Sequence, residues 1–279
     1  MDADRTIVAV AKAGRSEMIH VENLGVTFNN GTALENRALH DVTLSISAGE
    51  FVTIIGSNGA GKSTLLNVLA GEIPPTTGRI FIDGSDVTSW PVYRRASMLA
   101  RMFQDPRAGI CEDMSILENI AIAVGRTAPR RFRFGVTDEI RALAIERLSL
   151  LHLGLEMRLH DRVMLLSGGQ RQALALVMAT LGSTKVLLLD EHTAALDPAA
   201  AELVMNLTIA IVKEFAITTV MVTHSMRQAL DFGCRTIMLH QGQIILNIDG
   251  ADRASMTVEQ LVKMFRRKEG LADGHLLLA

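Results

Sequence analysis

A glycine-rich segment that ends in lysine and serine constrains the fold of this chain more than any other feature. Residues 56–63 read Gly-Ser-Asn-Gly-Ala-Gly-Lys-Ser and match the phosphate-binding pattern G-x-x-x-x-G-K-[ST]. The apolar run 51–55 predicts a strand before it, and residues 63–70 predict a helix after it that ends at Gly71. A strand, a glycine loop and a helix in this order indicate an α/β fold that binds nucleotide phosphates.

The residue types in this loop suit phosphate chemistry. Its glycines allow backbone N–H groups to approach phosphate oxygens, which a Cβ atom would obstruct. We expect Lys62 to reach the β- and γ-phosphates from a solvent-accessible loop, and the Ser63 hydroxyl to ligate Mg²⁺. The candidate nucleotide ligands here are Gly56, Ser57, Asn58, Gly59, Ala60, Gly61, Lys62, Ser63 and Thr64.

A pair of adjacent acids follows a second apolar run. Residues 186–189 are Val-Leu-Leu-Leu, and Asp190 and Glu191 come directly after them. A carboxylate at the end of a buried parallel strand lies where ligands gather in open α/β sheets. Because side chains alternate at a strand end, Asp190 is expected to orient Mg²⁺ and Glu191 to polarise the attacking water. The alternative is that Asp190 and Glu191 are simply solvated acids at the end of a strand and have no role in catalysis.

Composition narrows the classes of function. The chain has 28 basic and 30 acidic residues and a net charge of −2, so no strong positive field would recruit nucleic acid. No uninterrupted apolar run reaches the roughly 18 residues that a membrane helix needs. The N-terminus, Met-Asp-Ala-Asp-Arg, lacks the pattern of a signal peptide. We therefore expect a cytosolic chain that contacts a membrane only through another polypeptide.

The pattern of apolar residues predicts the other elements. An irregularity is expected near Gly25 in the first strand. Residues from about 91 to 167 are expected to form a helical subdomain. The expected domains are a tail at 1–17, a nucleotide-binding domain at 18–250 and a C-terminal helix and tail at 251–279. Further strands are expected at 19–28, 42–47, 80–82, 186–189, 217–222, 236–239 and 243–246, and helices at 115–124, 138–150 and from a capping box at 257–260.

The segment 166–170, Leu-Ser-Gly-Gly-Gln, precedes the acidic motif by a short stretch. With the motifs above, it makes the chain resemble the ATP-binding subunits of ABC transporters, particularly bacterial importer ATPases, across nearly all of residues 19–250. The resemblance implies a P-loop NTPase fold: a RecA-like core sheet with an antiparallel β part, plus an inserted α-helical lobe that carries the signature. It also implies hydrolysis of ATP, with ATP and Mg²⁺ bound between two subunits.

The resemblance assigns further site residues. Phe28 matches the aromatic residue that stacks on adenine, and Gln104 matches the glutamine that touches Mg²⁺ and water in a loop facing the permease. His224 matches the switch histidine that senses the γ-phosphate. The signature residues, which the family presents to the γ-phosphate of the opposite subunit, are Ser167, Gly168, Gly169 and Gln170.

The same resemblance implies partners and a location. It implies a second copy of the chain, integral membrane permease subunits and a substrate-binding protein, with no nucleic acid. The expected place is the cytoplasmic face of the inner membrane, peripherally bound. The alternative is a soluble ABC ATPase that serves a cofactor-assembly scaffold.

Two features stand outside this pattern. His192 replaces the proline that usually follows the catalytic glutamate, and we expect it to have no catalytic share. Arg126, Arg130, Arg131 and Arg133 form a basic stretch, interpreted as a solvated loop. The alternative for this stretch is contact with the permease or with anionic lipid headgroups.

Overall fold

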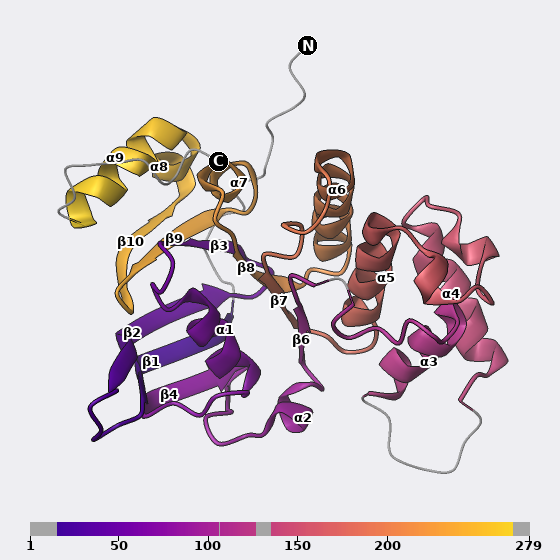
Figure 1. Ribbon diagram of the computed structural model, residues 1–279, viewed down its shortest axis with the longest axis horizontal. Coiled ribbons are helices and arrows are strands. Elements are labelled where there is room, and N and C mark those ends of the chain that lie inside the picture. Colours follow the sequence, from indigo (N-terminus) through magenta and orange to yellow (C-terminus); the bar gives the residue numbers. More distant parts are fainter. Residues whose placement is uncertain (1–15, 106, 127–134, 270–279) are drawn as a thin grey trace. The chain divides into compact units, whose positions relative to one another are not determined.

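The computed structural model describes residues 16–105, 107–126 and 135–269 (Figure 1). The chain forms two compact units. Of the described residues, the first unit comprises 16–92 and 218–269, and the second comprises those within 93–217. Both units combine strands with helices, so the predicted α/β class is confirmed.

The first unit contains an antiparallel sheet of order β2-β1-β4-β5. Along β2, Val42, Leu44 and Ile46 are buried and the residues between them are exposed, as a period of two requires. The register of β1 against β2 shifts between Leu24 and Val26, which confirms the irregularity expected near Gly25. The strands are β1 (Glu17–Phe28), β2 (Asn36–Ser47), β4 (Thr77–Ile82) and β5 (Ser85–Asp86).

Four more strands of the first unit include β3, which leads into the glycine-rich loop. They are β3 (Phe51–Ile55), β8 (Thr218–Val222), β9 (Arg235–His240) and β10 (Gln243–Asp249). Strand β3 lies between β8 and β9 and runs parallel to both, while β10 is antiparallel to β9. Helix α1 (Lys62–Ala70) follows β3 and ends at Gly71, whose φ of 83° is left-handed. The expected order of strand, loop and helix is therefore present.

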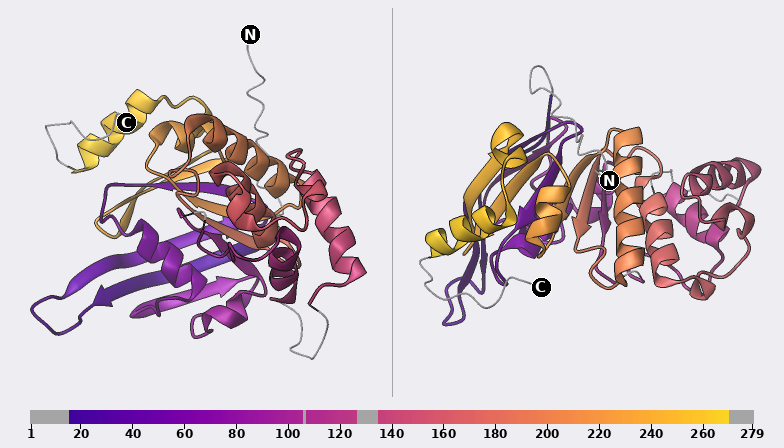
Figure 2. Two further views of the ribbon diagram at one scale, coloured as in Figure 1. Left: turned by 45° about the vertical axis from the view of Figure 1, so that its right-hand side comes forward. Right: turned by 90° about the horizontal axis from the view of Figure 1, so that it is seen from above.

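Three helices at the C-terminal end complete the first unit: α7 (Met226–Asp231), α8 (Gly250–Ala254) and α9 (Val258–Glu269). Helix α8 contacts β9 and β10, and α9 contacts α7 (Figures 1 and 2). Leu261 and Phe265 bury one side of α9 against Met226. The expected capping box is present, because Gln260 N–H donates to Thr257 Oγ1 at 3.2 Å and Thr257 N–H donates to Gln260 Oε1 at 2.8 Å. Helix α8 was not predicted.

The second unit is mostly helical around two parallel strands, β6 (Leu99–Met102) and β7 (Val186–Asp190). Helix α5 packs against α6 and α3, and the views of Figure 2 show α5 and α6 side by side. The helices are α2 (Val92–Arg95), α3 (Ile116–Gly125), α4 (Asp138–Ser149), η1 (Leu155–Met157), η2 (Val163–Leu165), α5 (Gly168–Thr180) and α6 (Pro198–Glu214).

Strand β6 corrects one expectation, because it lies inside the stretch expected to be helical. Its sequence, Leu-Ala-Arg-Met, contains no β-branched or aromatic residue, so local propensity gives no strand signal. Pairing with β7 makes it a strand. Strand β1 also begins at Glu17, inside the expected tail, and β2 begins at Asn36, so the loop before it is shorter than expected.

Part of the sequence-based interpretation lies outside the described residues. The structure does not describe residues 127–134, which contain Arg130, Arg131 and Arg133 of the basic stretch. It also does not describe most of the N-terminal tail. Within the described part, no helix combines the length and the apolar character needed to cross a membrane.

Candidate nucleotide-binding and hydrolysis site

The glycine-rich loop turns between the end of β3 and the start of α1. Gly61 has a φ of 99°, and a Cβ atom there would lie 2.6 Å from the carbonyl oxygen of Ala38. Only glycine combines this left-handed conformation with so close an approach of backbone. No side chain caps the N-terminus of α1, and its first turn contains no acid. The start of α1 is therefore available to an anion.

Lys62 is buried, whereas Asn58 and Gly59 of the same loop are exposed, as expected for a solvent-accessible loop. Its side chain is folded back on the loop, and only 5% of the residue is exposed. The Nζ atom donates to the carbonyl oxygens of Gly56 at 2.8 Å and Ser57 at 2.9 Å. Ser63, the next residue, is exposed. The ammonium thus lies inside the loop that is expected to hold phosphates.

His224 lies at the same edge of the sheet as this loop. In the parallel pair β3–β8, Ile54 is in register with Val222, and Thr223 N–H donates to Ile54 O at 3.1 Å. The two strands therefore end together, with the glycine loop after one and His224 after the other. His224 is exposed. Ser225 caps α7 directly after it by accepting from Gln228 N–H at 3.2 Å.

Phe28 belongs to the antiparallel sheet of the same unit. It is the last residue of β1, is half-buried and pairs with Asn36 of β2. The strand end positions its ring, and residues 29–35 form the connection to β2.

The acidic pair of the second unit lies at the end of β7. Arg101 of the neighbouring strand β6 donates from Nη2 to Asp190 Oδ2 at 2.6 Å. Glu191, directly after the strand, has a φ of 48°. Residues with bulky side chains seldom adopt this left-handed backbone, and such outliers occur often at functional sites. The two acids therefore differ in environment: Asp190 is in an ion pair, and Glu191 lies on a constrained turn.

His192 is enclosed behind this turn. It is 1% exposed, and its Nε2 lies 3.3 Å from Thr208 Oγ1. The Thr208 hydroxyl donates to the carbonyl oxygen of Val204 at 2.8 Å, so its oxygen must accept from His192. The imidazole therefore carries its proton on Nε2. Burial lowers the pKa of His192 from 6.5 to about 4, which keeps the ring neutral at physiological pH.

The signature segment forms the start of α5. Ser167 Oγ accepts from Gln170 N–H at 3.3 Å, and Gln170 Oε1 accepts from Ser167 N–H at 3.1 Å. A Cβ atom on Gly169 would lie 3.1 Å from Cβ of Ala200 in α6, so glycine lets the two helices approach closely. The Ser167 oxygen is engaged as an acceptor within the helix, but its proton remains available to a phosphate.

Gln172, which the sequence reasoning missed, joins three of these segments. It lies on the buried face of α5, with 1% exposed. Its Nε2 donates to His192 O at 2.6 Å and to Phe103 O at the longer distance of 3.4 Å. One amide therefore links the signature helix to the turn after β7 and to the segment that leads to the exposed Gln104. The signal in the sequence was a polar residue two positions after the signature, directly before the apolar run 173–179.

Each unit contains part of the predicted site. The first unit contains Phe28, residues 56–64 and His224; the second contains Gln104, residues 167–170, Asp190 and Glu191.

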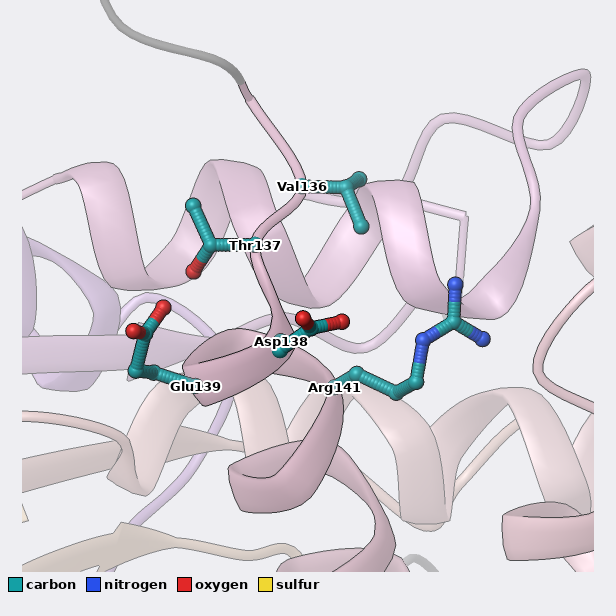
Figure 3. A pocket seen from close by; sticks show the side chains of 5 residues that line it. All are labelled: Val136, Thr137, Asp138, Glu139 and Arg141. Carbon is teal, nitrogen blue, oxygen red and sulfur yellow. The ribbon is translucent and has the colours of Figure 1, made fainter.

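A shallow hollow at the start of α4 contains none of these residues. Figure 3 shows the residues that line it, Val136, Thr137, Asp138, Glu139 and Arg141.

Comparison with known proteins agrees with the motifs. The family model described as ABC transporter matches residues 39–194, more than half of the chain. The chain belongs to the ABC transporter family. This ABC protein is an ATPase with the P-loop NTPase fold, so the resemblance inferred from its sequence is confirmed. The matched range includes the glycine loop, the signature and the acidic pair, and it excludes Phe28 and His224.

Three relatives of this ABC ATPase illustrate the likeness. It is 41% identical over 248 residues to the tyrosine transport ATP-binding protein of Clostridioides difficile (strain R20291), which covers 89% of this chain and 98% of that protein. It is 34% identical to the energy-coupling factor transporter ATP-binding protein EcfA2 of Ligilactobacillus salivarius (strain UCC118), over 93% and 85% of the two chains. The dimeric post-hydrolysis structure of the ATP-binding cassette MJ0796, bound to ADP and Pi, superposes with a TM-score of 0.70 at 29% identity, covering 83% of this chain and 98% of that one.

Proposed function

We propose that this chain is the motor subunit of an importer, in which ATP-driven closure of a dimer acts on a separate membrane permease. The observation that carries the proposal is the likeness, over almost the full length of both chains, to a protein named for tyrosine transport. An amino acid is accordingly the proposed class of cargo. We place the subunit peripherally on the cytoplasmic face of the inner membrane.

ATP is proposed to bind first through the glycine loop. The uncapped start of α1 supplies backbone N–H groups, and Lys62 exchanges the carbonyls of Gly56 and Ser57 for phosphate oxygens. A charged acceptor strengthens a hydrogen bond from an ammonium, so this exchange favours the bound state. Phe28 is proposed to stack on the adenine.

The oxygen-bearing residues fit Mg²⁺. We assign the metal to Ser63, Gln104 and Asp190, whose hydroxyl, amide and carboxylate oxygens are of the kind that Mg²⁺ accepts, directly or through water. The Asp190 carboxylate already pairs with one positive group, the guanidinium of Arg101, which supports the proposal that a cation binds here. When bound, the metal would neutralise charge on the phosphates.

Hydrolysis is assigned to three residues. Glu191 is proposed to accept the proton of the attacking water, a task that suits a carboxylate on a constrained turn after a strand. His224 is proposed to donate a hydrogen bond to the γ-phosphate, because it lies at the same sheet edge as the glycine loop. Gln104 is proposed to help orient the water.

The site is completed by a second copy. We propose that Ser167, Gly168 and the start of α5 in one copy bind the γ-phosphate held by the other copy's glycine loop. The dimeric cassette structure with ADP and Pi supports this arrangement. Asp197 caps α6 by accepting from Ala200 N–H at 3.0 Å. It is proposed to lie near the seam, because Leu196 directly before it lies against Gly168 of the signature.

An apolar surface of the second unit is the proposed contact with the permease. Met164 and Leu165 are 52% and 65% exposed. Met114 is 41% exposed and lies beside them, because Val163 N–H donates to Met114 O at 3.0 Å. Exposed apolar groups gathered in this way are typical of protein contacts. We extend the surface to the Gln104 segment and to α3, where Ile122 is 51% exposed.

The division of labour can be tested with the purified chain and the assembled complex. Amino acids, tyrosine among them, should give no heat of binding with the chain alone and should not change its ATPase rate. In liposomes that contain the permease, hydrolysis should accelerate when the loaded substrate-binding protein is added. A specific micromolar complex of cargo with the chain alone would contradict the proposal. Hydrolysis that ignores the permease and the binding protein would favour the scaffold ATPase instead.

A further inference from the structure

Arg101 and Asp190 form an ion pair at the ends of two parallel strands. Met102 of β6 is in register with Leu189 of β7, which brings the two side chains together. The guanidinium and carboxylate are 2.6 Å apart, and only 10% and 17% of the two side chains are exposed. In such a setting each charge depends on the other, since little water is present to screen it.

Arg101 has a second partner, in the direction of Gln104. Its Cζ atom lies 4.8 Å from the centre of the Phe103 ring, within the range of a cation–π contact. The carbonyl of Phe103 is in turn linked to α5 through Gln172. One guanidinium therefore connects the carboxylate assigned to Mg²⁺ with the residue directly before Gln104.

A guanidinium and a divalent cation cannot both hold this carboxylate at full strength, because they repel each other and compete for the same oxygens. We propose that Arg101 is the built-in counter-ion of Asp190, which competes with Mg²⁺ and leaves the carboxylate when the metal arrives. Arrival of the metal then alters the contact of Arg101 with Phe103 and signals to the Gln104 segment. The inference rests on the proposed role of Asp190 in metal binding.

The alternative is that Arg101 helps Mg²⁺ to bind, and this role also makes a definite prediction. An arginine that merely orients Asp190 would help the metal, so its removal would weaken Mg²⁺ binding. Competition predicts that removal strengthens it. The sign of the effect decides between the two roles.

The test measures binding rather than turnover. The full chain is loaded with a fluorescent non-hydrolysable ATP analogue and titrated with Mg²⁺. Arg101→Met should lower the half-saturating Mg²⁺ concentration by at least about fivefold, the lower end of typical coupling between two ligands. Arg101→Lys keeps the charge and should return the value towards that of the parent. An unchanged or raised value in Arg101→Met would overturn the inference.

Two further variants separate the possible failures. Arg158→Met removes another ion pair of the same unit, Arg158 Nε to Asp161 Oδ2 at 2.7 Å, and should leave the Mg²⁺ dependence unchanged. Asp190→Asn should raise the Mg²⁺ requirement. If it does not, the assignment of the metal to Asp190 fails. If it does, and Arg101→Met shows no gain, only the role of Arg101 fails.

A reporter at position 103 tests the signal. Trp90 is the one tryptophan in the sequence, so Phe103→Trp in a Trp90→Phe background gives a single fluorophore beside Arg101. Its emission should shift when Mg²⁺ is added to the nucleotide-loaded chain. The shift should be absent when Arg101→Met is added. Equal shifts in both would show that the metal reaches this segment without Arg101.

Discussion

The Nζ atom of Lys62 donates a hydrogen bond to the carbonyl oxygen of Gly56, 2.8 Å away, at the other end of the same loop. The carbonyl oxygen of Ser57 accepts a second bond at 2.9 Å. The loop thus satisfies its own buried ammonium, and phosphate oxygens would replace two neutral acceptors with charged ones.

Replacing Lys62 by alanine should weaken ATP binding by about 10- to 100-fold, the range for loss of a hydrogen bond to a charged group. Hydrolysis should fall with it. The fold should survive, with a loss of about 1 kcal/mol in the free energy of unfolding for the loop contacts. Calorimetry with ATP and a denaturant titration measure the two effects. Lys263→Ala, at an exposed position of α9, is the matched control. Hydrolysis at the parent rate would show that the γ-phosphate is held elsewhere.

Glu191→Gln should retain ATP binding and lose at least about 100-fold in hydrolysis, because the amide has nearly the same shape but cannot accept a proton. With MgATP the variant should elute as a dimer in size-exclusion chromatography. Glu146→Gln on α4 should behave like the parent chain. A monomeric Glu191→Gln, in an assay that does detect the trapped dimer of another ABC cassette, would count against the shared site.

His192→Pro should keep the turnover number within a few-fold of the parent. The imidazole contacts Thr208, and it is neutral and enclosed, so it is not available to hold a proton for the reaction. Without the hydrogen bond to Thr208, the free energy of unfolding should fall by about 1–2 kcal/mol. ATPase assays at saturating MgATP measure the first effect. Loss of turnover in a variant that still folds and binds ATP would make His192 a participant.

The same histidine should make the protein less stable in acid. Its pKa is about 4 in the folded chain, against 6.5 for an ordinary histidine, so the unfolded chain binds the proton more readily. Its contribution to stability is complete above pH 6.5, declines as the pH falls towards about 4, and then declines no further. The full loss is about 3 kcal/mol. His192→Gln can donate to Thr208 without titrating, so the difference between its pH profile and the parent's isolates the effect. Parallel profiles would contradict it.

Arg253 should prove important for the stability of the first unit. It is 8% exposed, and its Nη2 donates to the carbonyl oxygens of Ala229 and Leu230 in α7. Arg253→Met should lower the free energy of unfolding by about 2–4 kcal/mol, because buried carbonyls lose their donor. Arg227→Met, which removes an exposed pair from α7, should change it by less than about 0.5 kcal/mol. Equal effects of the two would contradict this reasoning.

Local pattern was sufficient for the elements that carry strong periodic or turn signals. Strand β3, the helix that starts at Lys62 and the capping box of α9 were all predicted, because strand, loop and cap chemistry lie within a few residues of one another. The alternation along β2 and the irregularity near Gly25 follow from the same rule. The nucleotide motifs were recognisable because each requires particular residue types at short spacing.

Tertiary structure decided what depends on residues far apart in sequence. Leu99–Met102 became a strand only because β7 offers it a partner, which no local propensity indicates. Lys62 is buried because the loop folds over it, and His192 is neutral because tertiary packing buries it. The pairing of Arg101 with Asp190 joins residues 89 positions apart. Sequence by itself determined which chemical groups this ATPase has; packing determined which of them lie together, because contact energies act across space and not along the chain.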